Sequence, residues 1–93
     1  MTERLIHPED YPYRHPPLLE FIRTNGLDPW AIPEAFPIVT EGGQLTVTEF
    51  VFEELPDGRR RKVLIHNPDG TVESFAKHSV TVPLKSPPED HGL

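Results

Sequence analysis

The stretch that decides the fold runs from Gln44 to Leu84 and reads QLTVTEFVFEELPDGRRRKVLIHNPDGTVESFAKHSVTVPL. Two turn triplets, Pro56-Asp57-Gly58 and Pro68-Asp69-Gly70, divide it into runs of β-branched, aromatic and aliphatic residues. Proline suits the second position of a type I turn and glycine suits the left-handed position that follows, so each triplet predicts a tight hairpin. Strand-like runs between such turns predict an antiparallel β-meander of three to four strands.

The first strand of this stretch changes phase along its length. Leu45 and Val47 occupy odd positions, whereas Phe50 and Phe52 occupy even ones. Strict alternation would place these two pairs on opposite faces of the sheet. A bulge near Thr48-Glu49 would bring all four to one face, and the polar residues between them favour it. Otherwise a helix covers one face and a partner chain covers the other.

A short helix is expected before the sheet, over residues 18–25. Its apolar stripe includes Phe21 and Ile22, and Gly26 follows as a left-handed stop. A single helical turn should begin at Asp28, which can cap it. We expect Trp30 in this turn to join Phe21 and Ile22 as a structural anchor of the core. The prediction is therefore an α+β domain, with one short helix and a helical turn packed on the meander.

The two ends of the chain differ in composition from this domain. Residues 1–17 predict an extended Pro-rich arm, which Tyr11 and Tyr13 can pin to the domain or to a partner. Residues 18–85 predict a single α+β domain. Residues 86–93 are acidic and Pro-rich, which predicts a disordered tail.

Composition limits the classes of function. The chain of 93 residues carries a net charge of −6, no cysteine and no apolar run of membrane-spanning length. Disulfides and thiolate chemistry are excluded, and we expect a cytoplasmic protein that does not enter a membrane. An acidic chain also lacks the overall field that attracts nucleic acid.

No arrangement of residues predicts catalysis. The sequence has no P-loop, GxGxxG, HExxH or GxSxG motif, and most carboxylates lie in turns or at solvated strand positions. The five histidines are not spaced to converge on a metal ion. We therefore expect no catalytic residues, no metal and no cofactor in a protein that is not an enzyme.

A cationic block follows the first turn and allows two interpretations. It can balance the two glutamates that precede the turn across a hairpin, or it can contact a partner, either the phosphates of nucleic acid or the carboxylates of an acidic partner. The net negative charge favours the first interpretation. The candidate interaction residues are Arg59, Arg60, Arg61, Lys62, Phe50, Phe52, Tyr11 and Tyr13.

Several segments together resemble a group of small uncharacterised proteins of actinobacteria and their phages. The segments are Asn25-Gly26-Leu27-Asp28-Pro29, Ile32-Pro33, residues 42–50, Pro56-Asp57-Gly58-Arg59 and residues 81–88. The resemblance covers roughly residues 18–88. It implies an accessory protein of a phage or mobile element, or a host protein of that descent, and it transfers no catalytic residue.

The predicted function is a small non-enzymatic protein-interaction module. It would bind a host protein, or a second copy of itself, through an exposed sheet face or edge. The alternative is a nucleic-acid-binding accessory protein that uses Arg59–Lys62, with Tyr11 or Tyr13 stacking on bases. A third hypothesis is a small enzyme or ligand binder with a pocket near Trp30, which needs convergent polar groups.

Overall fold

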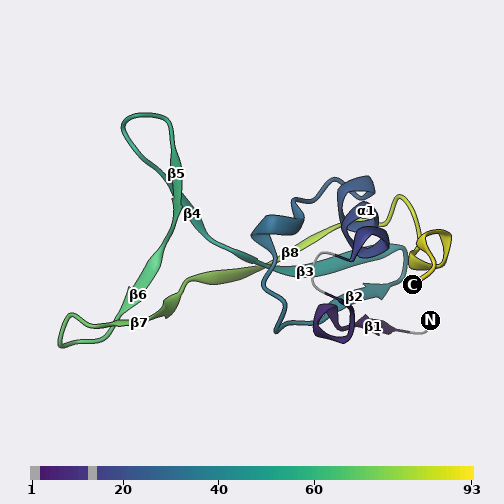
Figure 1. Cartoon of the computed structure of the whole chain (residues 1–93), viewed down its shortest axis with the longest axis horizontal. Helices are drawn as coiled ribbons and strands as arrows, with labels where there is room; N and C mark the ends of the chain where they lie inside the picture. Colours follow the sequence, from purple (N-terminus) through teal and green to yellow (C-terminus); the bar gives the residue numbers. More distant parts are fainter. Residues whose placement is uncertain (1–2, 13–14) are drawn as a thin grey trace.

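A four-stranded antiparallel sheet forms the body of the protein in the computed structural model, which describes residues 3–12 and 15–93 (Figure 1). Its strand order is β1-β2-β3-β8. The strands are β1 (Arg4–Ile6), β2 (Ile38–Glu41), β3 (Gln44–Phe50) and β8 (Lys77–Pro83). The predicted α+β class with an antiparallel sheet is confirmed.

The helix α1 (Pro16–Thr24) packs on one face of this sheet. Pro16 and Pro17 occupy its first turn, where a missing N–H costs little. Beneath it lie the odd-numbered side chains of β3, Leu45 and Val47, which are 0% and 1% exposed. Phe21 and Ile22 of α1 are buried against them, as their spacing predicted. The buried core consists of Ile6, Leu18, Phe21, Ile22, Ile38, Leu45 and Val47.

The expected helical turn is the 3-10 helix η2 (Pro29–Ala31). Asp28 caps it, because its Oδ1 accepts a hydrogen bond from the backbone N–H of Trp30 at 3.0 Å. Pro29 and Ala31 are the buried residues of this turn, whereas Trp30 is 50% exposed. The prediction that Trp30 anchors the core is therefore wrong: the small Ala31 turns inward and the indole lies at the surface.

Residues 3–12 and 86–93, which fall in the predicted arm and tail, belong to the body instead; residues 1–2 and 13–14 of the predicted arm lie outside the described residues. Ile6 of β1 is buried, and the 3-10 helix η1 (Pro8–Asp10) follows it with Pro8 buried. At the other end, the 3-10 helix η3 (Pro88–His91) packs beside α1, and the His91 ring meets Phe21 at 5.6 Å. An ion pair of 2.7 Å between Arg4 and Glu89 joins the two ends.

Residues 44–84 do not form one continuous meander. Only β3 and β8 belong to the main sheet; β4 (Phe52–Glu54) pairs with β5 (Arg60–Lys62), and β6 (Leu64–His66) pairs with β7 (Val72–Phe75). These two hairpins project from the end of the β3–β8 pair and diverge (Figure 1). The radius of gyration is accordingly 15.0 Å, whereas a compact domain of this length has about 12 Å.

The three strand pairs meet at a junction, where three backbone hydrogen bonds connect three residues in a closed ring. The Val51 N–H donates to the Ala76 carbonyl at 2.9 Å, Ala76 donates to Val63 at 2.8 Å, and Val63 donates to Val51 at 2.9 Å. Each of these three residues ends one strand pair and begins the next. We call Val51, Val63 and Ala76 the junction triad.

The junction explains the change of phase that the sequence shows between Val47 and Phe50. The pairing of β3 with β8 keeps one register from Gln44 to Phe50, so the predicted bulge at Thr48-Glu49 is wrong. Phe50 therefore faces away from α1, on the side opposite to Val47. Because Phe50 faces away from the core, Phe50 and Phe52 remain candidates for contact with a partner.

The two Pro-Asp-Gly triplets form the hairpin turns that they predicted. In the first, Gly58 has φ of 86° and its N–H donates to Leu55 at 2.9 Å. In the second, Gly70 has φ of 88° and donates to Asn67 at 2.9 Å. The aspartate of each triplet also accepts a hydrogen bond from the backbone N–H two residues later. The second hairpin differs from the first by one bulge next to Ile65.

Candidate interaction surface at the strand junction

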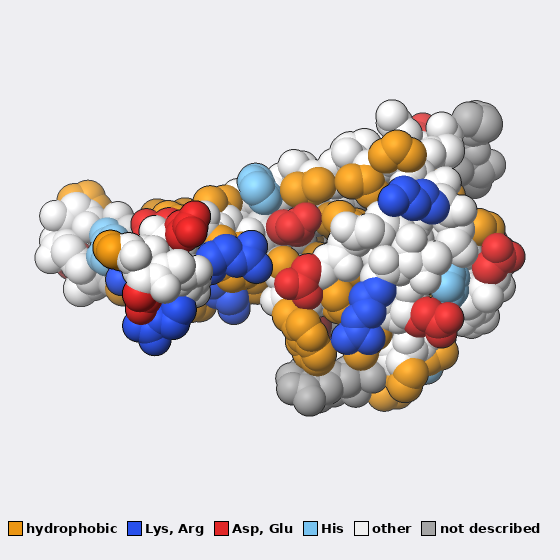
Figure 2. Space-filling model, turned by 90° about the horizontal axis from the view of Figure 1, so that it is seen from above, with side chains coloured by type: hydrophobic (Ala, Val, Ile, Leu, Met, Phe, Trp, Pro, Cys, Tyr) orange, Lys and Arg blue, Asp and Glu red, His pale blue; other side chains and the backbone are white. Residues whose placement is uncertain are grey.

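Six side chains surround the junction triad on one face. Each triad residue has one neighbour on either side in the sequence, and the side chains of both neighbours point to the opposite face from its own, because side chains alternate along an extended strand. The strand register pairs these six as Phe50 with Lys77, Phe52 with Lys62, and Leu64 with Phe75. We call this set the junction face. Figure 2 shows Lys and Arg side chains beside hydrophobic ones on the projecting part of the molecule.

Contacts between rings and ammonium groups hold the junction face together. Phe50 and Phe75 meet edge to face, with centroids 5.9 Å apart and an interplanar angle of 81°. Lys62 Nζ lies 4.0 Å from the Phe50 centroid and 5.0 Å from that of Phe75. Such cation–π contacts contribute about 0.5–1 kcal/mol each at exposed sites. Lys62 thus links side chains from all three strand pairs.

Lys77 extends this cluster towards the body. Its Nζ lies 5.6 Å from the Phe50 centroid and 5.7 Å from the centroid of Phe36, and it donates a hydrogen bond of 3.0 Å to the Phe75 carbonyl. Phe36 lies in the connection between η2 and β2 and is 38% exposed. The apolar surface therefore continues from the junction onto the body.

Strand alternation divides the predicted cationic block between two faces. Arg59 pairs with Asp57 at 2.6 Å, and Arg61 forms an ion pair with Glu53 across the hairpin. Arg60 instead lies over the Phe52 ring at 5.0 Å, on the same side as Lys62. The prediction that these cations balance glutamates across the hairpin holds for Arg61. The block does not form one continuous cationic surface.

The second hairpin carries most of the exposed apolar side chains. Of seven large hydrophobic residues that are exposed in the described part of the chain, four lie on β6 and β7. They are Leu64, Ile65, Val72 and Phe75, with exposed fractions of 40%, 41%, 55% and 42%. A two-stranded hairpin alone is only marginally stable in water. None of these four side chains belongs to the buried core.

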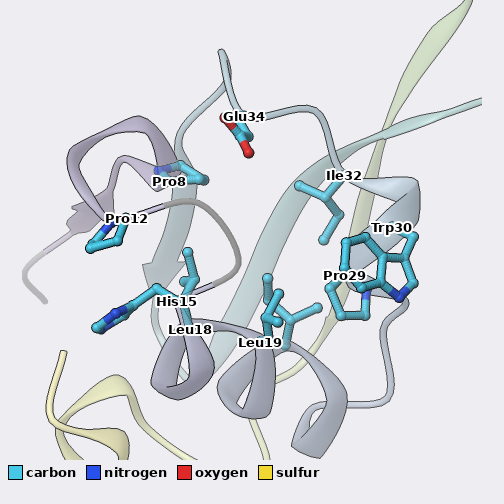
Figure 3. A pocket seen from close by; sticks show the side chains of 10 residues that line it. Pro8, Pro12, His15, Leu18, Leu19, Pro29, Trp30, Ile32 and Glu34 are labelled. Atoms are coloured by element: carbon cyan, nitrogen blue, oxygen red, sulfur yellow. The ribbon is translucent and has the colours of Figure 1, made fainter.

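A separate pocket of about 120 Å³ lies on the body beside Trp30 (Figure 3). Pro29 and Trp30 stand at one end of it and Pro8 and Pro12 at the other, and α1 forms its floor (Figure 3). Its polar lining residues are His15 and Glu34, and the remaining lining residues are hydrophobic. A pocket therefore lies where the third hypothesis places one, and His15 and Glu34 are the two polar residues that line it.

Of the two predicted tyrosines, Tyr11 lies on the body, away from the junction. Tyr11 packs against the core and stacks on His15, with ring centroids 5.1 Å apart. Tyr13 lies outside the described residues. Within residues 3–12 and 15–93, no three His, Asp or Glu side chains converge as metal ligands. No helix in the same part of the chain is long and apolar enough to cross a membrane.

Sequence reasoning identified Phe50, Phe52 and Lys62 but missed Leu64, Phe75 and Lys77 as members of one surface. A signal was present in the triplets Phe50-Val51-Phe52, Lys62-Val63-Leu64 and Phe75-Ala76-Lys77, each a small or β-branched residue between two large ones. The triad residues are spaced by 12 and 13 positions, and the bulge in the second hairpin accounts for the additional residue.

Comparison with models of protein families, with curated proteins and with solved structures finds no match to this chain.

Proposed function

We propose that this protein is a small non-enzymatic module that binds another protein through its two projecting hairpins. One observation carries the proposal: the exposed apolar side chains concentrate on β6 and β7, outside the body. The body buries its own core between α1 and the main sheet. The apolar residues of the hairpins are therefore available to a partner, as in other exposed hydrophobic contact surfaces.

The charge distribution supports a protein partner over nucleic acid. Arg59 and Arg61 are engaged with Asp57 and Glu53, so the cationic block offers only Arg60 and Lys62 to successive phosphates. Binding to nucleic acid depends on several cations that contact successive phosphates. The resemblance to proteins of actinobacteria and their phages favours a host protein as the partner. The lack of cysteine is compatible with a role in the reducing cytoplasm.

Position-dependent photo-crosslinking in the cells that encode the chain tests this function. A photoreactive phenylalanine analogue in place of Phe75 or Leu64 should form adducts with one or a few defined proteins. The same analogue in place of Leu5 is the matched control, because Leu5 is 48% exposed but lies on β1 of the body. Adducts from the Leu5 position alone, or none from either hairpin position, would refute the proposal.

Light scattering of the purified protein identifies the case in which the partner is a second copy. A dimer that Phe75→Ser converts to a monomer would place self-association on the hairpins. A dimer that this change leaves intact would place it on the body. If both the wild type and Phe75→Ser are monomers, the partner is a different protein.

A further inference from the structure

We propose that the junction face binds an acidic peptide segment that carries apolar side chains. This inference rests on the proposed protein-binding function and names the chemistry of its partner. It depends on two properties that meet on the same side of the hairpins: exposed aromatic and aliphatic side chains, and cations that form no ion pair with a carboxylate of the described residues.

The apolar part of the face consists of side chains from all three strand pairs. Phe75 and Leu64 are 42% and 40% exposed, and Phe50 and Phe52 are half-buried beside them. Exposed aromatic rings in such clusters supply much of the contact energy at protein interfaces. A partner side chain such as leucine or phenylalanine would therefore pack against Leu64 and Phe75.

The junction face carries two cations, Lys62 and Lys77, and Arg60 lies beside it on the same side of the hairpin, over the Phe52 ring. Within the described residues, the arginines and lysines that form ion pairs are Arg4, Arg59 and Arg61. Arg60, Lys62 and Lys77 form none, so their charges remain available to a partner. Glu54 is the carboxylate opposite Arg60 in the strand register, which leaves an excess of positive charge on the face. At physiological ionic strength, charges beyond about 8 Å are largely screened. An approaching segment therefore responds to this local charge rather than to the net charge of −6.

The ring geometry favours a peptide over single-stranded nucleic acid. A base that stacks on an aromatic residue needs the face of the ring. Lys62 Nζ already occupies a position 4.0 Å from the Phe50 centroid, and Phe75 meets Phe50 by its edge. A carboxylate needs no ring face, because it can approach the ammonium group of Lys62 from the solvent side.

Selection from a random 12-residue peptide library displayed on phage, with the full chain as target, tests the inference. We expect enrichment of Asp and Glu beside Leu, Phe or Trp. Labelled peptides from the selection should then bind in fluorescence anisotropy, and their affinity should fall as the salt concentration rises. A labelled 12-nucleotide deoxythymidine strand should bind more weakly at physiological salt.

Two neighbouring residues of β5 provide the matched pair of variants. Lys62→Gln and Arg61→Gln remove the same charge from the same strand but on opposite faces. We expect Lys62→Gln to weaken peptide binding by about two- to fivefold, the range for an exposed ion pair. Arg61→Gln should leave binding unchanged. Phe75→Ser should weaken binding further, with the circular dichroism and melting curve confirming that the body remains folded.

Several outcomes would overturn the inference. They are enrichment of basic or uncharged sequences, no enrichment at all, equal effects of Lys62→Gln and Arg61→Gln, or tighter binding of the oligonucleotide. Failure here is distinguishable from failure of the proposed function. Crosslinks from the Phe75 and Leu64 positions with no acidic preference would leave a protein-binding module with a different partner chemistry.

Discussion

Replacement of Asn25 by alanine should destabilise the body strongly, because this one side chain joins the end of α1 to the segment after β8. Asn25 is 2% exposed. Its Nδ2 donates to the carbonyls of Phe21 at 2.9 Å and Ser86 at 3.1 Å. Its Oδ1 accepts from the backbone N–H groups of Lys85 at 2.8 Å and Ser86 at 3.1 Å. Alanine removes all four hydrogen bonds.

The size of the effect follows from the groups that lose their partners. An unsatisfied buried polar group costs about 1–3 kcal/mol, and water offsets part of this where the group is accessible. Ser86 is half-buried and Lys85 is exposed, so only part of the full penalty applies. We therefore expect Asn25→Ala to lower the free energy of unfolding by about 2–4 kcal/mol, out of the 5–15 kcal/mol typical of a domain. The melting temperature should fall by about 10–25 °C.

Urea denaturation followed by circular dichroism and by Trp30 fluorescence measures this change. Thr24→Ala is the matched control, because Thr24 is the exposed last residue of the same helix. We expect the control to change stability by no more than about 0.5 kcal/mol. A loss below about 1 kcal/mol for Asn25→Ala, or an equal loss for both variants, would refute the reasoning that Asn25 joins the two segments.

Three further predictions concern the projecting hairpins. Hydrogen bonds from the Thr71 side chain and then its backbone lower the pKa of Asp69. Thr71→Val should raise that pKa towards its ordinary value in a carboxyl NMR titration. In the wild type, the Asp69 carboxylate should stabilise its turn fully above pH 3.8, the ordinary pKa, and this stabilisation should be lost as pH falls through the lowered pKa. Gly58→Ala forces a φ of 86° on alanine with no atom in its way, so it should destabilise the first hairpin by about 1 kcal/mol, visible as faster amide exchange there. Val63→Pro removes the N–H that donates to Val51, so it should accelerate amide exchange at the junction while leaving the melting of the body nearly unchanged; full protection of the Val51 amide would contradict this.

The local elements were predictable because their signals lie within a few residues of one another. Pro56-Asp57-Gly58 specifies its turn by proline at the second position and glycine at a positive φ. The spacing of Phe21 and Ile22 specifies the face of α1 that is buried. Asp28 marks the start of η2 by its cap to the Trp30 N–H.

The arrangement of the strands was not predictable, because it depends on contacts between distant residues. β3 can pair either with the strand that returns from the first turn, β5, or with β8. The turns alone do not decide between these partners, and in the structure β3 pairs with β8. A meander and a three-way junction use the same two hairpin turns. They differ in the partners of the strands on either side of Val51, Val63 and Ala76, where each segment passes from one strand pair to the next.

The candidate surface was predictable only in part for the same reason. The even positions of Phe50 and Phe52 break the alternation that Leu45 and Val47 set in the sequence, but Phe75 becomes their neighbour only through the junction. Trp30 was misplaced because a residue of its size in a short core is usually buried, whereas Ala31 occupies the inward position here.

The central claim is that the junction face, and not the body, receives the partner. The most direct measurement is an NMR titration of the ¹⁵N-labelled protein with an acidic peptide from the display selection. We expect the amide signals of residues 50–52, 62–64 and 75–77 to shift together with one saturation curve. Shifts confined to α1, η2 and the pocket beside Trp30, with these nine amides unchanged, would contradict the claim.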